Sequence, residues 1–172
     1  MSALVCMVFA CAPQNNTDTS KKAVNTETVL ADTTVSKERE WLMQSINRYF
    51  TTTELGMLDE VRRSISTSAY YQYKTDAMQV GLDVEEGMSE EEFDEKWKGR
   101  FDTSKAGIGL GFLISGQDWD SIEVEKCKVA SKTAHGVWFD VVLKDITLQE
   151  DYISKILVDV EEGKFAIADV QQ

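Results

Sequence analysis

The amino-acid sequence predicts an α+β domain in which N-terminal helices pack on a curved antiparallel sheet of about five strands. Between residues 36 and 99, apolar side chains recur at the three- and four-residue spacing of helices. From residue 106 onward they recur at every second position, as in strands. Helices and strands that occupy separate parts of a chain are typical of this class, and 172 residues suffice for one such domain.

Four helices are predicted from the spacing of their apolar residues. The first begins at Ser36, whose hydroxyl can cap it, and ends near Phe50. The second and third cover residues 53–64 and 67–80. The fourth covers residues 89–99.

The stretch DVEEGMSEEEFDE, residues 83–95, is strongly acidic. A calcium-binding EF-hand loop requires glycine at its sixth position, but counted from Asp83 the glycine, Gly87, is at the fifth. Ser89 and Glu92 instead have the spacing of a capping box, and acidic side chains suit the first turn of a helix. We therefore expect a helix start here and no metal.

Glycine alternates with large apolar residues in AGIGLGFLI, residues 106–114. This alternation predicts the first strand, with one bulky face and one bare face. Glycines at this spacing also occur in nucleotide-binding loops, but those loops lie between a strand and a helix. We therefore predict a strand whose bare face a helix or a ligand can approach closely.

The remaining strands follow at 121–130, 136–145 and 151–160. The last of these turns at Gly163, where a positive φ is needed, into a closing strand with the sequence KFAIADV. The alternation in 136–145 places Phe139 on one face and its neighbours on the other.

The N-terminal stretch ALVCMVFA, residues 3–10, is apolar but too short to cross a bilayer. Cys11 follows it, and residues 12–35 are polar without a periodic apolar face, which predicts a flexible tether. The folded domain then covers residues 36–172.

Residues 1–11 resemble a bacterial lipoprotein signal. In that family a small residue precedes the cysteine and an aliphatic residue lies three positions before it, and here these are Ala10 and Val8. The resemblance implies that Cys11 is lipidated and anchors the protein to a membrane of the bacterial cell envelope, on the periplasmic side or at the surface. More than one acyl chain is needed for stable attachment of this kind.

The element order of residues 36–172, with its closing hairpin ILVDVEEGKFAIADV, resembles the cystatin-like or NTF2-like α+β cone, particularly that of small uncharacterised envelope lipoproteins. The resemblance implies a cavity between the helices and the concave sheet. Members of this superfamily range from isomerases and dehydratases to non-catalytic binding modules, so the resemblance assigns no activity.

Acidic and aromatic side chains are the candidates for lining such a cavity. In SGQDWDS, Asp118 and Asp120 flank Trp119, but neighbours in sequence reach the separation of about 5 Å that a retaining glycosidase needs only by chance. A turn explains the same residues, and aromatics at helical spacing are explained by a core. The possible pocket residues are Tyr70, Tyr73, Asp118, Trp119, Asp120, Trp138 and Asp140.

Histidine and cysteine are scarce. The chain contains one histidine, His135, and three cysteines, which are too few for a disulfide framework or a zinc site. We place His135 in a turn and Cys127 along the adjoining strand, opposite residues near 138–139, so that the two do not form a nucleophile pair. No metal and no cofactor are expected.

A net charge of −12 repels polyphosphate, so we expect no nucleic-acid partner. The absence of a complete catalytic motif favours a lipid-anchored envelope protein whose domain binds a small molecule or an envelope protein without catalysis. Two alternatives stay open. One is a pocket enzyme of isomerase or hydrolase type that uses a buried carboxylate, and the other is a protein–protein inhibitor or assembly module that uses the acidic segment 83–95.

Overall fold

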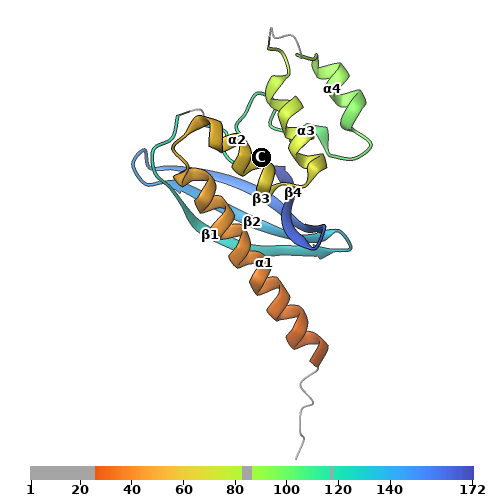
Figure 1. Cartoon of the computed structure of the whole chain (residues 1–172), viewed down its shortest axis with the longest axis vertical. Helices are drawn as coiled ribbons and strands as arrows, with labels where there is room; N and C mark the ends of the chain where they lie inside the picture. Colours follow the sequence, from red (N-terminus) through yellow and green to blue (C-terminus); the bar gives the residue numbers. More distant parts are fainter. Residues whose placement is uncertain (1–25, 83–86, 117) are drawn as a thin grey trace, which may run out of the picture.

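The computed structural model describes residues 26–82, 87–116 and 118–172, and it is an α+β structure. The helices, which come first in the chain, are α1 (Thr26–Thr51), α2 (Leu55–Ile65), α3 (Ser68–Gln79) and α4 (Glu90–Trp97), with a short 3₁₀ helix η1 (Thr103–Lys105). The antiparallel sheet has the order β1 (Ile122–Thr133), β2 (Gly136–Asp145), β3 (Glu150–Glu161) and β4 (Lys164–Gln171). Helix α1 crosses one face of the twisted sheet, α3 lies beside β4, and α4 packs beside α3, farther from the sheet (Figure 1).

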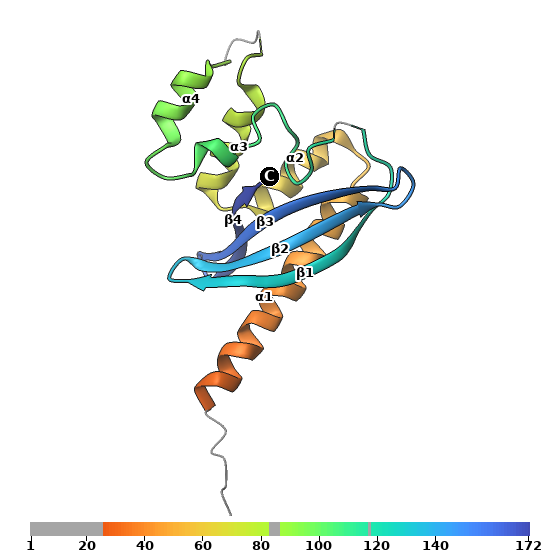
Figure 2. The same ribbon diagram turned by 180° about the vertical axis from the view of Figure 1, so that it is seen from behind.

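Helix α1 begins at Thr26 rather than at Ser36, so residues 26–35, which the sequence assigned to a tether, are helical. The first turns of α1 extend past the edge of the sheet, where a helix does not need an apolar face, and this explains why the periodicity did not predict them (Figure 2). No helix in the described part of the chain combines the length and the apolar character that a membrane span needs. Residues 1–25, including Cys11, lie outside the described residues.

The core lies between α1 and the inner face of the sheet. Leu42 and Ile46 of α1 and Phe139 and Val141 of β2 are buried in the same hydrophobic cluster. Trp138 alternates with these core residues along β2, is only partly buried and lies on the other face, so the predicted alternation is confirmed. The resemblance predicted a cavity between the helices and the concave sheet, but these side chains fill that space beneath α1.

Residues 106–116 form an irregular loop, so the prediction of a strand here was wrong and the sheet has four strands instead of five. Gly107 and Gly109 have φ values of +58° and +71°, which an extended strand does not use. Phe112, Leu113 and Ile114 are all buried in succession, so burial does not alternate. The glycines therefore permit a folded loop, although their spacing resembles that of a strand.

The predicted capping box of α4 is confirmed. The Ser89 hydroxyl accepts a hydrogen bond from the Glu92 N–H at 3.2 Å, and the Glu92 carboxylate accepts from the Ser89 N–H at 2.8 Å. Residues 83–86 of the acidic segment lie outside the described residues. Within the described ranges, no three His, Cys, Asp or Glu side chains come together as metal ligands would.

The junction between α2 and α3 is attached to β4 through the backbone. The Thr67 N–H donates to the Ile167 carbonyl oxygen at 2.8 Å, and Ser66 forms a parallel bridge with the same residue. The Ser68 N–H donates to the Glu161 carboxylate at 2.9 Å. These contacts hold the start of α3 against the edge strand of the sheet.

A buried carboxylate, Asp145, connects the end of β2 to the segment just before β1. It accepts hydrogen bonds from the N–H groups of Asp120 at 2.8 Å and of Thr147 and Leu148, both at 2.9 Å. These N–H groups hold the pKa of Asp145 below its usual value. The sequence did not single out this residue, because an Asp at the end of a strand is also what an ordinary turn contains.

We expect Asp145→Ala to lower the free energy of unfolding clearly more than an exposed substitution does, because the N–H groups of Asp120, Thr147 and Leu148 lose a charged acceptor. The lowered pKa means that this stabilisation is present above the pKa of the unfolded chain and is lost as the pH falls. Urea denaturation at pH 7 measures the loss, with the exposed Asp118→Ala as the control. Equal effects of the two substitutions would contradict this role for Asp145.

Candidate binding cleft

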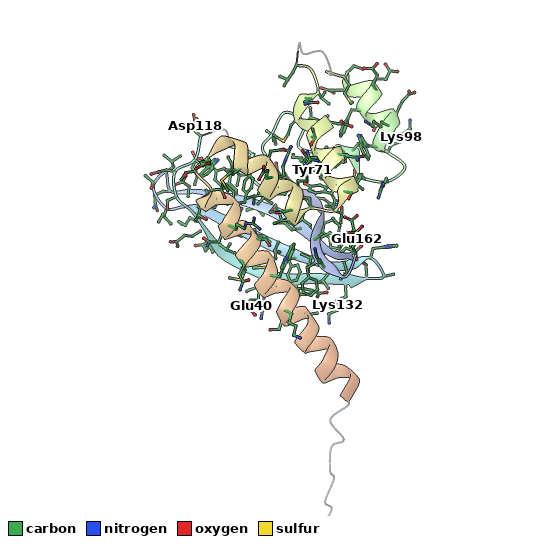
Figure 3. All side chains as sticks on the ribbon, viewed as in Figure 1. Glu40, Tyr71, Lys98, Asp118, Lys132 and Glu162 are labelled. Atoms are coloured by element: carbon green, nitrogen blue, oxygen red, sulfur yellow. The ribbon has the colours of Figure 1, made fainter. Side chains whose placement is uncertain are left out.

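A cleft of about 510 Å³ lies at the end of the sheet where the β1–β2 and β3–β4 turns are found. Its lining comes from the start of α3, the segment after α4, and strands β2, β3 and β4. The residues are Thr67, Ala69, Arg100, Phe101, Asp102, His135, Trp138, Leu157, Asp159, Val160, Glu161, Ala168 and Asp169. In Figure 3, Glu162 in the β3–β4 turn and Lys98 at the end of α4 lie on this side of the molecule.

Apolar side chains form opposite walls of the cleft. Trp138 of β2 and Leu157 of β3 are cross-strand partners on the sheet face away from α1. Across the cleft, Phe101 stacks on Tyr73, with ring centroids 4.1 Å apart and an interplanar angle of 14°. Tyr73 also contacts Trp97 edge to face, so the Phe101 wall belongs to an aromatic layer that continues into the core.

Acidic groups predominate among the polar lining residues, and several already have hydrogen-bond donors. Glu161 accepts from the N–H and the hydroxyl of Ser68, at 2.9 and 3.2 Å. Asp159 accepts from the Val160 N–H at 2.7 Å, and Asp102 accepts from the Ser104 hydroxyl at 2.6 Å. These bonds fix the directions of the carboxylates without neutralising them.

Asp169 of β4 is the most deeply placed of these carboxylates, with 8% of its surface exposed. It accepts a hydrogen bond from the Gln171 side-chain amide at 3.2 Å, and it has no ion pair with any described Lys or Arg. Burial raises the pKa of Asp169, and the negative charge of Asp102 adds to this. Asp169 was not predicted from the sequence, where the available signal was a lone acidic residue in the apolar strand KFAIADV.

Behind the cleft, Lys74 of α3 is almost fully buried. Its ammonium group donates to the carbonyl oxygens of Ala106 at 2.8 Å and Gly107 at 3.1 Å, which attaches α3 to the glycine-containing loop. Burial lowers the pKa of Lys74 to about 8, assisted by the charge of Arg62 and opposed by that of Asp169. Lys74 was also missed, since a lysine in a helix usually lies at the surface.

Two of the predicted pocket residues, Tyr70 and Tyr73, are buried in the core. A core position was the alternative interpretation of these aromatics at helical spacing. Tyr70 packs on Tyr73 and Phe101, and burial raises its pKa well above the usual value. Its hydroxyl has no hydrogen-bond partner within the part of the chain that the structure describes. These tyrosines therefore support the cleft wall from behind and do not line it.

The Asp118–Asp120 cluster lies far from the cleft, at the opposite end of the sheet (Figure 3). Asp118 and Asp120 are exposed, and Trp119 packs edge to face on Phe50 beside a smaller hollow of about 250 Å³. Asp140 lies in the middle of β2, opposite Lys155 of β3. Of the predicted pocket residues, Trp138 alone lines the cleft.

His135 lines the cleft from the two-residue turn between Thr133 and Gly136. Cys127 pairs with Val141, not with residues near 138–139, because the turn is nearer the C-terminus than the sequence indicated. Burial raises the pKa of the Cys127 thiol to about 11, which keeps it protonated at neutral pH. The separation of Cys127 from the turn, roughly 20 Å of strand, rules out a pair with His135.

Comparisons of the chain with protein-family models, with curated proteins and with solved structures found no match. Function is therefore inferred from the chemistry of the cleft. Apolar walls and a deep carboxylate are suited to holding a small molecule that combines an apolar body with a polar group.

The buried ammonium group gives a test of the packing behind the cleft. Because the pKa of Lys74 is lower in the folded than in the unfolded chain, the unfolded chain binds more protons between about pH 8 and pH 10. Lys74 therefore raises the free energy of unfolding by about 2 kcal/mol between pH 8 and pH 10. Denaturation at several pH values should show this gain in the wild type and in the exposed Lys98→Met control. If Lys74→Met retains the same gain, the lowered pKa is refuted.

Proposed function

We propose that this chain is a lipid-anchored protein of the bacterial cell envelope, and that its α+β domain binds a small molecule in the cleft without catalysing a reaction. The observation that carries the binding part is the cleft itself, whose volume of about 510 Å³ is within the usual range for small-ligand sites. Trp138 and Phe101 provide apolar contact area, and Asp169 provides a polar anchor point.

We also propose that the domain is of the cystatin-like or NTF2-like type. Its support is the element order, with helices first and a twisted antiparallel sheet closed by a hairpin. The closing turn at Glu162 and Gly163 has φ values of +52° and +78°, as the hairpin prediction required. The position of the cleft, on the sheet face away from α1, differs from the cavity that this resemblance implied.

A ligand screen by thermal shift and calorimetry tests the binding proposal. We expect Trp138→Ala to weaken binding of any ligand found by at least tenfold, because one apolar wall is removed. The matched control is Trp119→Ala, which removes an aromatic at the opposite end of the sheet. Ligands that depend on Trp119 but not on Trp138 would move the site to the hollow beside Phe50.

The anchor has its own test in the full chain. Expressed in bacteria with labelled fatty acid, the wild type and Cys6→Ser should incorporate the label and partition into detergent. Cys11→Ser should do neither, because Cys11 is the proposed acylated residue. Label retained in Cys11→Ser would refute this part of the proposal.

A second candidate function, a pocket enzyme, is favoured by Asp169 specifically. A buried carboxyl with a raised pKa is the kind of group that transfers protons in an apolar site. The enzyme would use Asp169 in place of the predicted Asp118, Asp120 or Asp140. Turnover of a cleft ligand that is abolished by Asp169→Asn, with binding retained, would replace the non-catalytic proposal.

A further inference from the structure

The charges that line the cleft are unbalanced. Four carboxylates, Asp102, Asp159, Glu161 and Asp169, line it together with one guanidinium, that of Arg100. Arg100 is exposed, its guanidinium lies 5.9 Å from the Phe101 ring centroid, and it has no ion pair with a described acid. A cleft with excess negative charge attracts cations and repels anions.

The imbalance is most costly at Asp169, where the carboxylate is more than nine-tenths buried and has no ion pair with a described Lys or Arg. The positive charge of Lys74 lowers the pKa of Asp169 and so works against the effect of burial. The ammonium group of Lys74, however, already donates to the carbonyl oxygens of Ala106 and Gly107. The neutral amide of Gln171 donates one hydrogen bond to the carboxylate and adds no charge. A buried carboxylate in this state is stabilised by any cation that reaches it.

The apolar walls restrict which cations fit. Trp138 and Leu157 on one side and Phe101 on the other offer aromatic and aliphatic surface, which a hydrated metal ion does not use. Aromatic rings also attract organic ammonium groups through their faces. The buried carboxylate of Asp169 and the aromatic walls together suit a molecule with a protonated amine at one end and an apolar group at the other.

We propose that the cleft binds an organic cation, with its amine at Asp169 and its apolar part between Trp138 and Phe101. This inference rests on the proposed binding function and assigns that site a class of ligand. Asp102 and Asp159 lie at the same cleft and contribute attraction at longer range, which salt screens.

The test compares probes that share an apolar group and differ in charge. Phenethylamine, phenethyl alcohol and phenylacetate form one series, and tryptamine, tryptophol and indole-3-acetate form another. Calorimetry and ligand-observed NMR on the wild-type protein should show each amine binding at least tenfold more tightly than its alcohol, with no binding of the carboxylates. Raising the salt concentration should weaken binding of the amines alone.

Variants then locate the charge effect. Asp169→Asn keeps the shape of the side chain and should weaken amine binding at least tenfold while leaving alcohol binding unchanged. Asp118→Asn removes an equal charge at the far end of the sheet and should change neither. Thermal denaturation of both variants confirms that they are folded.

The outcomes separate this inference from the function on which it rests. If alcohols or carboxylates bind as tightly as the amines, and Trp138→Ala abolishes that binding, the cleft is a binding site but the cation inference is wrong. If the amines bind equally well to wild type and Asp169→Asn, the inference is also wrong. If no probe of any charge binds, and the wider screen finds no ligand that depends on Trp138, both proposals fail.

Discussion

The hydrogen bond from the Thr67 N–H to the Ile167 carbonyl oxygen, 2.8 Å long, is the contact on which the arrangement of the site depends. It joins the junction of α2 and α3 to the edge of the sheet, and the adjacent Ser68 extends this attachment to Glu161 at the end of β3. Because α3 starts at this point, its direction determines where α4 and the segment of Phe101 lie. The cleft is the space left between that segment and the sheet face that carries Trp138 and Leu157.

Packing and charge have different roles around this junction. The aromatic layer formed by Tyr70, Tyr73, Trp97 and Phe101 makes one wall rigid, because each ring contacts another in the layer. Burial of charged groups opposes stability, and the molecule contains two such groups near each other in Lys74 and Asp169. Lys74 is compensated by two carbonyl oxygens that hold the glycine loop, whereas Asp169 has only neutral donors and faces the cleft. A carboxylate kept in this state at the cleft supports the proposal that the cleft is a binding site.

Most elements of the fold could be predicted from periodicity, since α2 to α4 and β1 to β4 have strong apolar patterns and clear turns. The pattern failed where glycine spacing in residues 106–114 resembled a strand, and where the first turns of α1 have no apolar face to detect. The site was less predictable. Trp138 was named from the sequence as an aromatic side chain that could line a cavity, but Asp169 and Phe101 meet it only through the long-range attachment of α3 to β4. No local pattern encodes that attachment. Asp118 and Asp120 attracted attention through their closeness in sequence, and they lie together at the end of the sheet opposite the cleft.

The central claim is that the cleft beside Trp138 and Asp169 is where this domain binds its ligand. Backbone amide shifts of the isotope-labelled domain, recorded while metabolite mixtures are added, test this claim most directly because they need no prior choice of ligand. The account predicts shifts concentrated at the amides of residues 67–69, 100–102, 157–161 and 168–169. Shifts confined to residues 109–116 and 119, around the smaller hollow beside Phe50, would contradict it.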